Sequence, residues 1–124
     1  MSEPIEAYIY ARCSTCRTAE AMIRASGRAA VFRDIFRDKL SRQELVDLLA
    51  RIGQTPHDLL STRSIPYREL GLAEKQLSAD ALLDLMAEYP ALLRRPILVI
   101  DGQVQVGLNQ KTLAAALDAA GATT

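Results

Sequence analysis

Hydrophobic positions in the first third of the chain follow two spacings, which predict a strand, a helix and a second strand. Residues 5–10 (Ile-Glu-Ala-Tyr-Ile-Tyr) carry β-formers in loose alternation. Helical spacing follows at four positions: Cys16, Ala19, Met22 and Ile23. Gly27 is suited to the position just past a helix end, and residues 30–36 have the composition of a second strand. A series of this length predicts a βαβ unit with parallel strands and a right-handed crossover.

The middle of the chain is predicted to be helical, because capping signals precede apolar positions at helical spacing. Residues 41–44 (Ser-Arg-Gln-Glu) form a capping box, and Gly53 ends the helix that follows it. The pair Thr55-Pro56 is an N-cap and a first-turn proline that open a short helix. Ser78 starts another helix in the same way.

The last third of the chain predicts a hairpin and a final helix. Residues 97–100 and 103–106 flank Asp101-Gly102, a residue pair typical of tight antiparallel turns, and Asn109 is placed to cap a helix. The order is therefore β-α-β, a helical insert, then β-β-α. This order predicts an α/β protein with a thioredoxin-like fold, in which helices flank a four-stranded mixed sheet.

Length and composition indicate one ordinary globular domain. The 124 residues are 49% hydrophobic and 24% charged, which excludes a disordered or fibrous chain. We predict that residues 1–124 form a single domain. Its core should comprise about residues 4–37 and 94–120, with the helical insert at about residues 38–93.

Net charge and hydropathy restrict the partners and the compartment. Fifteen basic and fifteen acidic residues cancel, so the chain lacks the basic excess of proteins that bind nucleic acids directly. We expect no sequence-specific DNA binding, and DNA to be approached only through another protein. No apolar run reaches the ~18–20 residues of a membrane span, and the first residues do not resemble a signal peptide. We therefore expect a cytoplasmic protein without a membrane partner.

The two cysteines form a CxxC motif where the first strand gives way to the first helix. Cys13 should lie at the helix N-terminus, where free N–H groups stabilise a thiolate, and Arg12 and Arg17 add positive charge nearby. We expect Cys13 to be the nucleophile. Cys16, one turn further along the helix, should be buried and able to attack a mixed disulfide on Cys13.

Other interpretations of the motif are weaker. A structural zinc ion usually takes four ligands, whereas the motif supplies two and His57 is the sole histidine, so no metal is expected. A disulfide closing so short a loop stabilises a fold by only roughly 2 kcal/mol. Two inert core cysteines are the remaining alternative. The position within a βαβ unit favours redox chemistry.

Two further segments carry candidate site residues. Arg95-Pro96 directly precedes the third predicted strand, where proline is tolerated and can adopt the cis form. We predict that Pro96 is the cis-proline facing the active cysteine and that Arg95 lies beside Cys13 to hold an anion or the thiolate. The alternative is that Arg95 is a solvated helix end. Residues 61–64 (Ser-Thr-Arg-Ser) could bind an anion or a partner, or could cap the next turn.

These segments together resemble the arsenate reductase and Spx family of thioredoxin-fold proteins, over nearly the whole chain. Five stretches resemble Spx-type segments in the right order: residues 13–17, 60–64, 67–71, 92–97 and 105–109. The resemblance to the glutaredoxin-coupled arsenate reductases implies a nucleophile at Cys13 and three arginines around the oxyanion. Arg95 matches one of these arginines, and Ser61 and Leu108 occupy the positions of the other two. Arg63 lies two residues beyond Ser61, and its guanidinium could compensate for the arginine missing at that position.

The resemblance to Spx-type proteins implies a different activity. Those proteins use a CxxC as a dithiol/disulfide switch and bind the C-terminal domain of the RNA polymerase α subunit, with a glycine contact that falls near Gly53. The favoured hypothesis is therefore a thiol-redox-responsive regulator. The alternative is a thiol-disulfide oxidoreductase in which Cys13 attacks and Cys16 resolves. In neither case is a bound cofactor expected, although a thiol reductant such as glutathione with glutaredoxin, or thioredoxin, is implied as a partner.

Overall fold

The computed structural model describes residues 3–122, so residues 1–2 and 123–124 of the predicted single domain lie outside the described residues. Within the described chain two compact units form. The first runs to Asp34 and resumes at Arg95, and the second comprises Ile35–Arg94. No helix in the described part of the chain is long and apolar enough to cross a membrane.

The first unit is built on the predicted four-stranded mixed sheet. Its strands are β1 (Ile5–Ile9), β2 (Ala30–Asp34), β3 (Ile97–Ile100) and β4 (Gln103–Val106). They lie in the order β2-β1-β3-β4, with β1 parallel to β2 and antiparallel to β3, and β3 antiparallel to β4. Asp101 and Gly102 both have positive φ, at 50° and 80°, as a tight hairpin turn between β3 and β4 requires.

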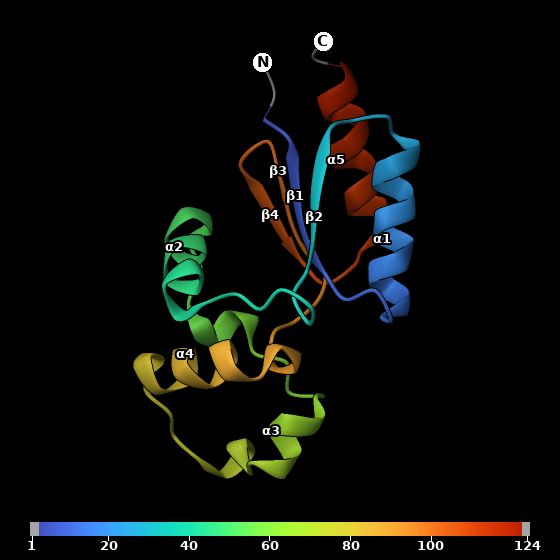
Figure 1. Ribbon diagram of the computed structural model, residues 1–124. Helices are drawn as coiled ribbons and strands as arrows, with labels where there is room; N and C mark the ends of the chain where they lie inside the picture. Colours follow the sequence, from blue (N-terminus) through green and yellow to red (C-terminus); the bar gives the residue numbers. More distant parts are fainter. Residues whose placement is uncertain (1–2, 123–124) are drawn as a thin grey trace. The chain divides into compact units, whose positions relative to one another are not determined.

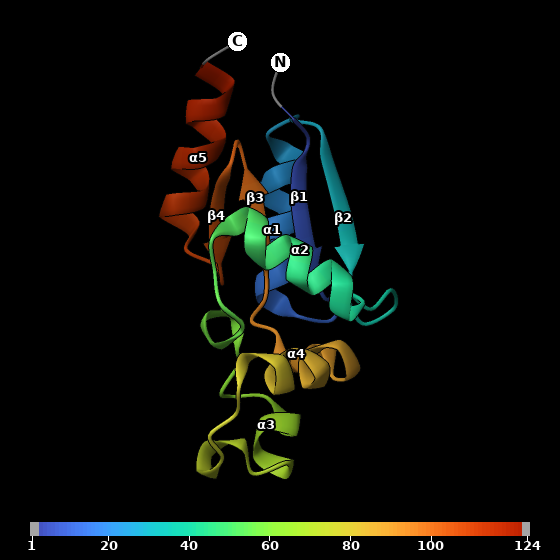
Figure 2. The same ribbon diagram turned by 90° about the vertical axis from the view of Figure 1, so that its left-hand side faces the viewer.

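Two helices cover one face of this sheet. α1 (Ser14–Ala25) and α5 (Gln110–Ala122) lie side by side there (Figures 1 and 2). Alternate residues of β1 point into the interface, since β-strand side chains alternate between the two faces. The buried cluster beneath the helices comprises Ile5, Ala7, Ile9, Cys16, Ala19, Ile23, Leu98, Ile100, Leu113 and Leu117. Cys16 is thus a member of the core that fixes α1 on the sheet.

The first two strands end earlier than predicted. The register of β1 and β2 stops at Ile9 and Asp34, whereas the sequence predicted strands to residues 10 and 36. Beyond that point β1 leads into a turn, in which the Cys13 N–H donates to the Tyr10 carbonyl oxygen at 3.0 Å. The Ala11 N–H donates to Asp34 Oδ2 at 3.3 Å. Turn hydrogen bonds replace the ladder, so the apolar side chains past the strand ends do not extend the sheet.

The second unit is helical, as predicted. It contains α2 (Arg42–Ile52), α3 (Ile65–Glu69), α4 (Ala79–Glu88) and three short 3₁₀ turns: η1 (Pro56–Leu59), η2 (Leu72–Glu74) and η3 (Pro90–Leu92). The capping box is confirmed, because Ser41 and Glu44 each accept a hydrogen bond from the other's backbone N–H. Gly53 ends α2 with φ of 68°.

Candidate functional site

The two cysteines occupy different environments at the start of α1. Cys13 is the N-cap residue, in extended conformation, and its carbonyl oxygen accepts the first helical hydrogen bond from Arg17 at 3.0 Å. Its side chain is half-buried. Cys16 lies one turn further along the helix and is fully buried in the core. Both thiols are free, so the structure represents the dithiol form.

The local hydrogen bonds make Cys13 acidic. Partial burial raises the pKa of its thiol, but hydrogen bonds from the Thr15 hydroxyl and from the Cys16 N–H and thiol outweigh burial and lower the pKa from 9.0 to about 7. The Thr15 Oγ1 lies 3.0 Å from the Cys13 Sγ. These donors, rather than the Arg12 and Arg17 charges on which the sequence prediction partly relied, are the causes of the lowered pKa. Near neutral pH about half of Cys13 is thiolate.

Cys16 is held in the opposite state. Burial is the main reason that the pKa of its thiol is raised to about 12. A hydrogen bond with the Tyr10 backbone and the charge of Arg95 act in the lowering direction, and the neighbouring Cys13 acts in the raising direction. Cys16 therefore keeps its proton and donates toward the Cys13 sulfur. The Cys13 sulfur can therefore attack as a thiolate, while the Cys16 sulfur remains protonated. Such a pair can form a mixed disulfide on Cys13 and then close an internal disulfide.

Thr15 sets the acidity of Cys13 and gives a direct prediction. Removing its hydroxyl in Thr15→Val should raise the pKa of Cys13 from about 7 toward 9.0, because a thiolate loses its closest side-chain donor. At pH 7 the rate of iodoacetamide alkylation should fall about sevenfold, since a hydrogen bond to a charged group is worth about 1.5 kcal/mol or more. The measurement is the alkylation rate from pH 5 to pH 10.

The control for this prediction is Thr15→Ser, which keeps the hydroxyl and should preserve the midpoint of the pH profile. All three proteins should reach similar rates at high pH, where Cys13 is fully ionised. An unchanged midpoint in Thr15→Val would show that the Thr15 hydroxyl does not contribute to the acidity of Cys13.

Arg95 and Pro96 lead into β3. The Arg95–Pro96 peptide bond is cis, as the sequence predicts, and Pro96 is buried, with its carbonyl oxygen accepting the Gly107 N–H at 2.8 Å. The Arg95 guanidinium carbon lies 5.7 Å from the centre of the Tyr10 ring. Its charge acts on Cys16, as the pKa of that thiol shows. The placement of Arg95 beside Cys13 stays a prediction.

The remaining candidate residues lie in the second unit. Arg63 is exposed in the loop between η1 and α3. Within that loop the Ser61 N–H donates to the Leu92 carbonyl oxygen at 2.7 Å, and Ser64 caps α3. Of the three roles that the sequence left open for this loop, capping is therefore present. Gly53 is exposed at the end of α2, where a side chain would meet no atom within 4 Å.

Sequence reasoning missed the roles of Thr15 and Asp34. Thr15 is two residues beyond the N-cap, where a hydroxyl can reach the N-cap side chain, so its position in Cys13-Ser-Thr-Cys16 carried a usable signal. The contact between Asp34 and Ala11 depends on strand register, which the sequence does not specify. Among residues 3–122 no cluster of three or more potential metal ligands occurs.

The sequence of this chain is similar to those of known proteins. The model of the ArsC family matches residues 8–116. The global transcriptional regulator Spx of Streptococcus pneumoniae strain R6 is 32% identical over 113 residues, which cover 91% of this chain and 85% of that protein. The global transcriptional regulator Spx 1 of Lactococcus lactis is 31% identical, with 91% and 88% covered.

Solved structures similar to this chain include proteins described as arsenate reductases. The arsenate reductase from Vibrio cholerae superposes with a TM-score of 0.77 at 28% identity, over 95% of this chain and 98% of that one. A possible arsenate reductase from Streptococcus mutans gives a TM-score of 0.73 at 31% identity, over 88% and 96%. The predicted thioredoxin-like α/β fold is thereby confirmed.

Proposed function

This chain belongs to the ArsC family, and from that premise we propose that it is a thiol-redox-responsive transcription regulator of the Spx type. Its switch is the Cys13–Cys16 pair. The observation that carries the proposal is the contrast between the two thiols, with a pKa of about 7 for Cys13 and about 12 for buried Cys16, in a chain similar to named Spx regulators. A sensor needs one sulfur that reacts readily and a second that reacts only afterwards.

The switching reaction uses a disulfide oxidant such as oxidised glutathione. The Cys13 thiolate attacks one sulfur of the oxidant, forms a mixed disulfide and releases one glutathione thiolate. Cys16 then loses its proton and attacks the Cys13 sulfur, which releases the second glutathione. Two protein thiols and one oxidant disulfide become one protein disulfide and two reduced glutathione molecules. Glutathione with glutaredoxin, or thioredoxin, would reverse the reaction.

Closing the disulfide would alter the start of α1. The Cys13 sulfur would give up the Thr15 hydroxyl and the Cys16 thiol as hydrogen-bond donors, and the negative charge at the helix N-terminus would disappear. Arg95, whose charge acts on Cys16, would then face a neutral disulfide. We propose that Arg95 thereby reports the redox state of the Cys13–Cys16 pair.

Gly53 is the proposed point of contact with that polymerase domain. It is exposed at the end of α2, and the surrounding space is open, so a partner backbone can approach closely. Because the chain itself has no net charge, regulation through a DNA-bound polymerase agrees better with its composition than direct DNA binding does.

A thiol-disulfide oxidoreductase related to arsenate reductase is the second candidate. The likeness to the arsenate reductase from Vibrio cholerae and the acidity of Cys13 favour it. In this role Cys13 would attack the substrate, Cys16 would resolve the intermediate, and Arg95 would hold an anion. Ser61 and Leu108 carry no charge, so fewer guanidinium groups are available to a doubly charged oxyanion than the enzyme resemblance implies.

One experiment distinguishes the two candidates. The full chain, reduced or oxidised with glutathione disulfide, is tested for binding to the purified polymerase α C-terminal domain, and the same samples are assayed for arsenate reduction with glutathione and glutaredoxin. We expect binding that differs between the two redox states, without arsenate turnover. Cys13→Ser is the matched control, because it lacks the sulfur that reacts with glutathione disulfide and should lose the redox dependence.

Two results would contradict the regulator proposal. Absence of binding in both redox states would remove the polymerase domain as the partner. Arsenate turnover without binding would establish the oxidoreductase instead, and Arg63→Ala would then test whether that guanidinium holds the oxyanion.

A further inference from the structure

The outer edge of β2 is open to another chain. β2 is the first strand in the sheet order, and β1 is its only strand partner among residues 3–122. Figure 2 shows β2 at the margin of the sheet. An edge strand presents N–H and C=O groups that can pair with a further extended segment. Val31, in the middle of this strand, is 59% exposed, which is unusual for a large apolar side chain in this protein.

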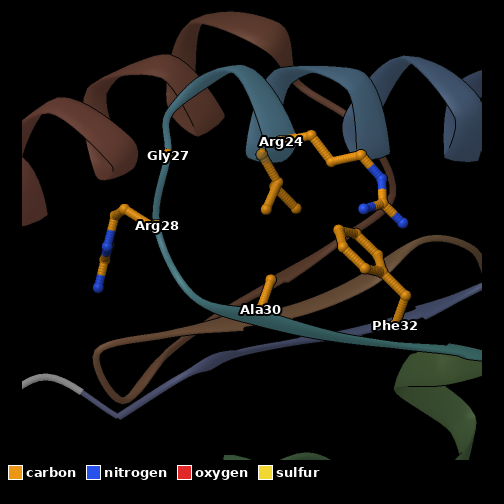
Figure 3. Close-up of a pocket in the computed structure, with 6 residues that line it drawn as sticks. Arg24, Gly27, Arg28, Ala30 and Phe32 are labelled. Atoms are coloured by element: carbon orange, nitrogen blue, oxygen red, sulfur yellow. The ribbon is translucent and has the colours of Figure 1, made fainter.

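A shallow hollow lies beside this strand, between β2 and the end of α1 (Figure 3). It is lined by Ile23, Arg24, Gly27, Arg28, Ala30 and Phe32, and its volume is about 260 Å³. Sites for small molecules usually measure ~300–1,000 Å³, so the hollow is better matched to one side chain that contacts Ala30 and Phe32 and passes the arginines at the rim. Together with the β2 edge these residues form what we call the β2 surface.

Arg24 provides an accessible positive charge at the rim of the hollow. Its guanidinium carbon lies 4.5 Å above the Phe32 ring centre, and its Nε donates to Glu20 Oε2 at 2.8 Å. The side chain nevertheless remains 63% exposed. The ring and the carboxylate thus hold the guanidinium in place while leaving it open to a second anion.

Arg28 has a different role at the same surface. Its side chain is only 13% exposed, and its Nη2 lies 3.0 Å from Asp101 Oδ1 in the hairpin between β3 and β4. Figure 3 shows it pointing away from the Arg24 side of the hollow. Arg28 therefore fixes the loop before β2 and does not serve as a contact residue.

The segment that contains α1 and β2 differs in charge from the rest of the chain. Residues 10–34 contain five arginines against Glu20 and Asp34, a net charge of +3, so the rest of the chain carries −3. A second copy pairing along the same edge would bring two positive regions together, which is unfavourable. An acidic partner is favoured instead. The open strand edge, with the apolar side chains of Ala30 and Phe32 beside it, favours a peptide over the phosphate backbone of a nucleic acid.

We propose that the β2 surface binds an acidic segment of another protein in extended conformation. The segment pairs with the outer edge of β2, inserts one apolar side chain into the hollow and places a carboxylate against Arg24. A neighbouring side chain of the segment covers Val31. Neither cysteine takes part, so the proposal stands independently of the redox function.

The test uses the full chain labelled for NMR and a blocked probe peptide, Glu-Val-Leu-Val-Glu-Val-Glu. In an extended peptide this order places the leucine and the glutamates on one face and the valines on the other. We expect shifts of the amide signals of Ala30–Asp34 and slower hydrogen exchange at those amides when the probe binds. The same peptide with lysine in place of glutamate should bind at least about tenfold more weakly.

Two variants locate the binding site. Arg24→Glu should weaken binding of the acidic probe about tenfold, whereas Lys111→Glu, the same change of charge on α5, should alter it less than about twofold. Both residues are exposed, and the amide spectra report whether each variant is folded. Shifts that leave residues 30–34 unchanged, or equal binding of the lysine probe, would overturn the proposal. Displacement of the probe by a short DNA duplex would assign the surface to nucleic acid instead.

Discussion

Replacing Cys16 by serine should trap a mixed disulfide on Cys13 after treatment with oxidised glutathione. Cys13 keeps its acidic thiol and still attacks the oxidant, but no sulfur remains one helical turn away to displace glutathione. The adduct should then persist on the order of a hundredfold longer than in the unchanged protein, because the intramolecular step is lost. Intact mass spectrometry at successive times measures the glutathionylated fraction directly.

The reciprocal variant, Cys13→Ser, tests the assignment of roles. Cys16 is buried and its pKa is about 12, so near neutral pH almost none of it is thiolate. Its modification should be at least about a thousandfold slower than that of Cys13 in the Cys16→Ser protein. Equal rates for the two single variants would contradict the division into an attacking and a resolving thiol, and with it both proposed functions.

Much of the fold could be predicted because local signals and the global arrangement agree. The capping box at Ser41, the turn pair Asp101-Gly102 and the spacing of Cys16, Ala19 and Ile23 each specify a local structure that the chain adopts. The sequence analysis did not predict α3 or the turns η2 and η3. They span three to five residues each, too short for a periodic hydrophobic pattern, and α3 has no buried residue.

The candidate site was predictable in its sulfur chemistry and in one cause of the Cys13 acidity, the N–H groups at the helix start, but not in the side-chain cause. The position of CxxC after a strand predicted an N-cap cysteine and a buried cysteine, and both are present. The arginines beside the motif were the wrong explanation for the acidity of Cys13, because sequence proximity does not give the direction of a long side chain. The contribution of Thr15 depends on a 3.0 Å contact, which only the folded helix start defines.

Replacing Ile23 by alanine should cost about 2–5 kcal/mol of the free energy of unfolding. Ile23 is fully buried in the cluster between α1, α5 and the sheet, and truncating such a side chain loses burial and leaves a cavity. A protein of this size has a total of about 5–15 kcal/mol, so the loss is a large fraction of its stability. Urea unfolding followed by circular dichroism gives the change.

Ile65→Ala is the matched control, since it makes the same substitution in a helix at a side chain that is 59% exposed. Its effect should stay within about 0.5 kcal/mol. Ile23 also shares its helix face with Cys16, so Ile23→Ala should let a thiol reagent reach Cys16 faster through transient opening of α1, while Ile65→Ala should not. Two results would contradict this prediction: equal losses of stability in the two variants, or unchanged protection of Cys16 in Ile23→Ala. Either would mean that the packing of Ile23 does not protect the Cys16 thiol from reaction.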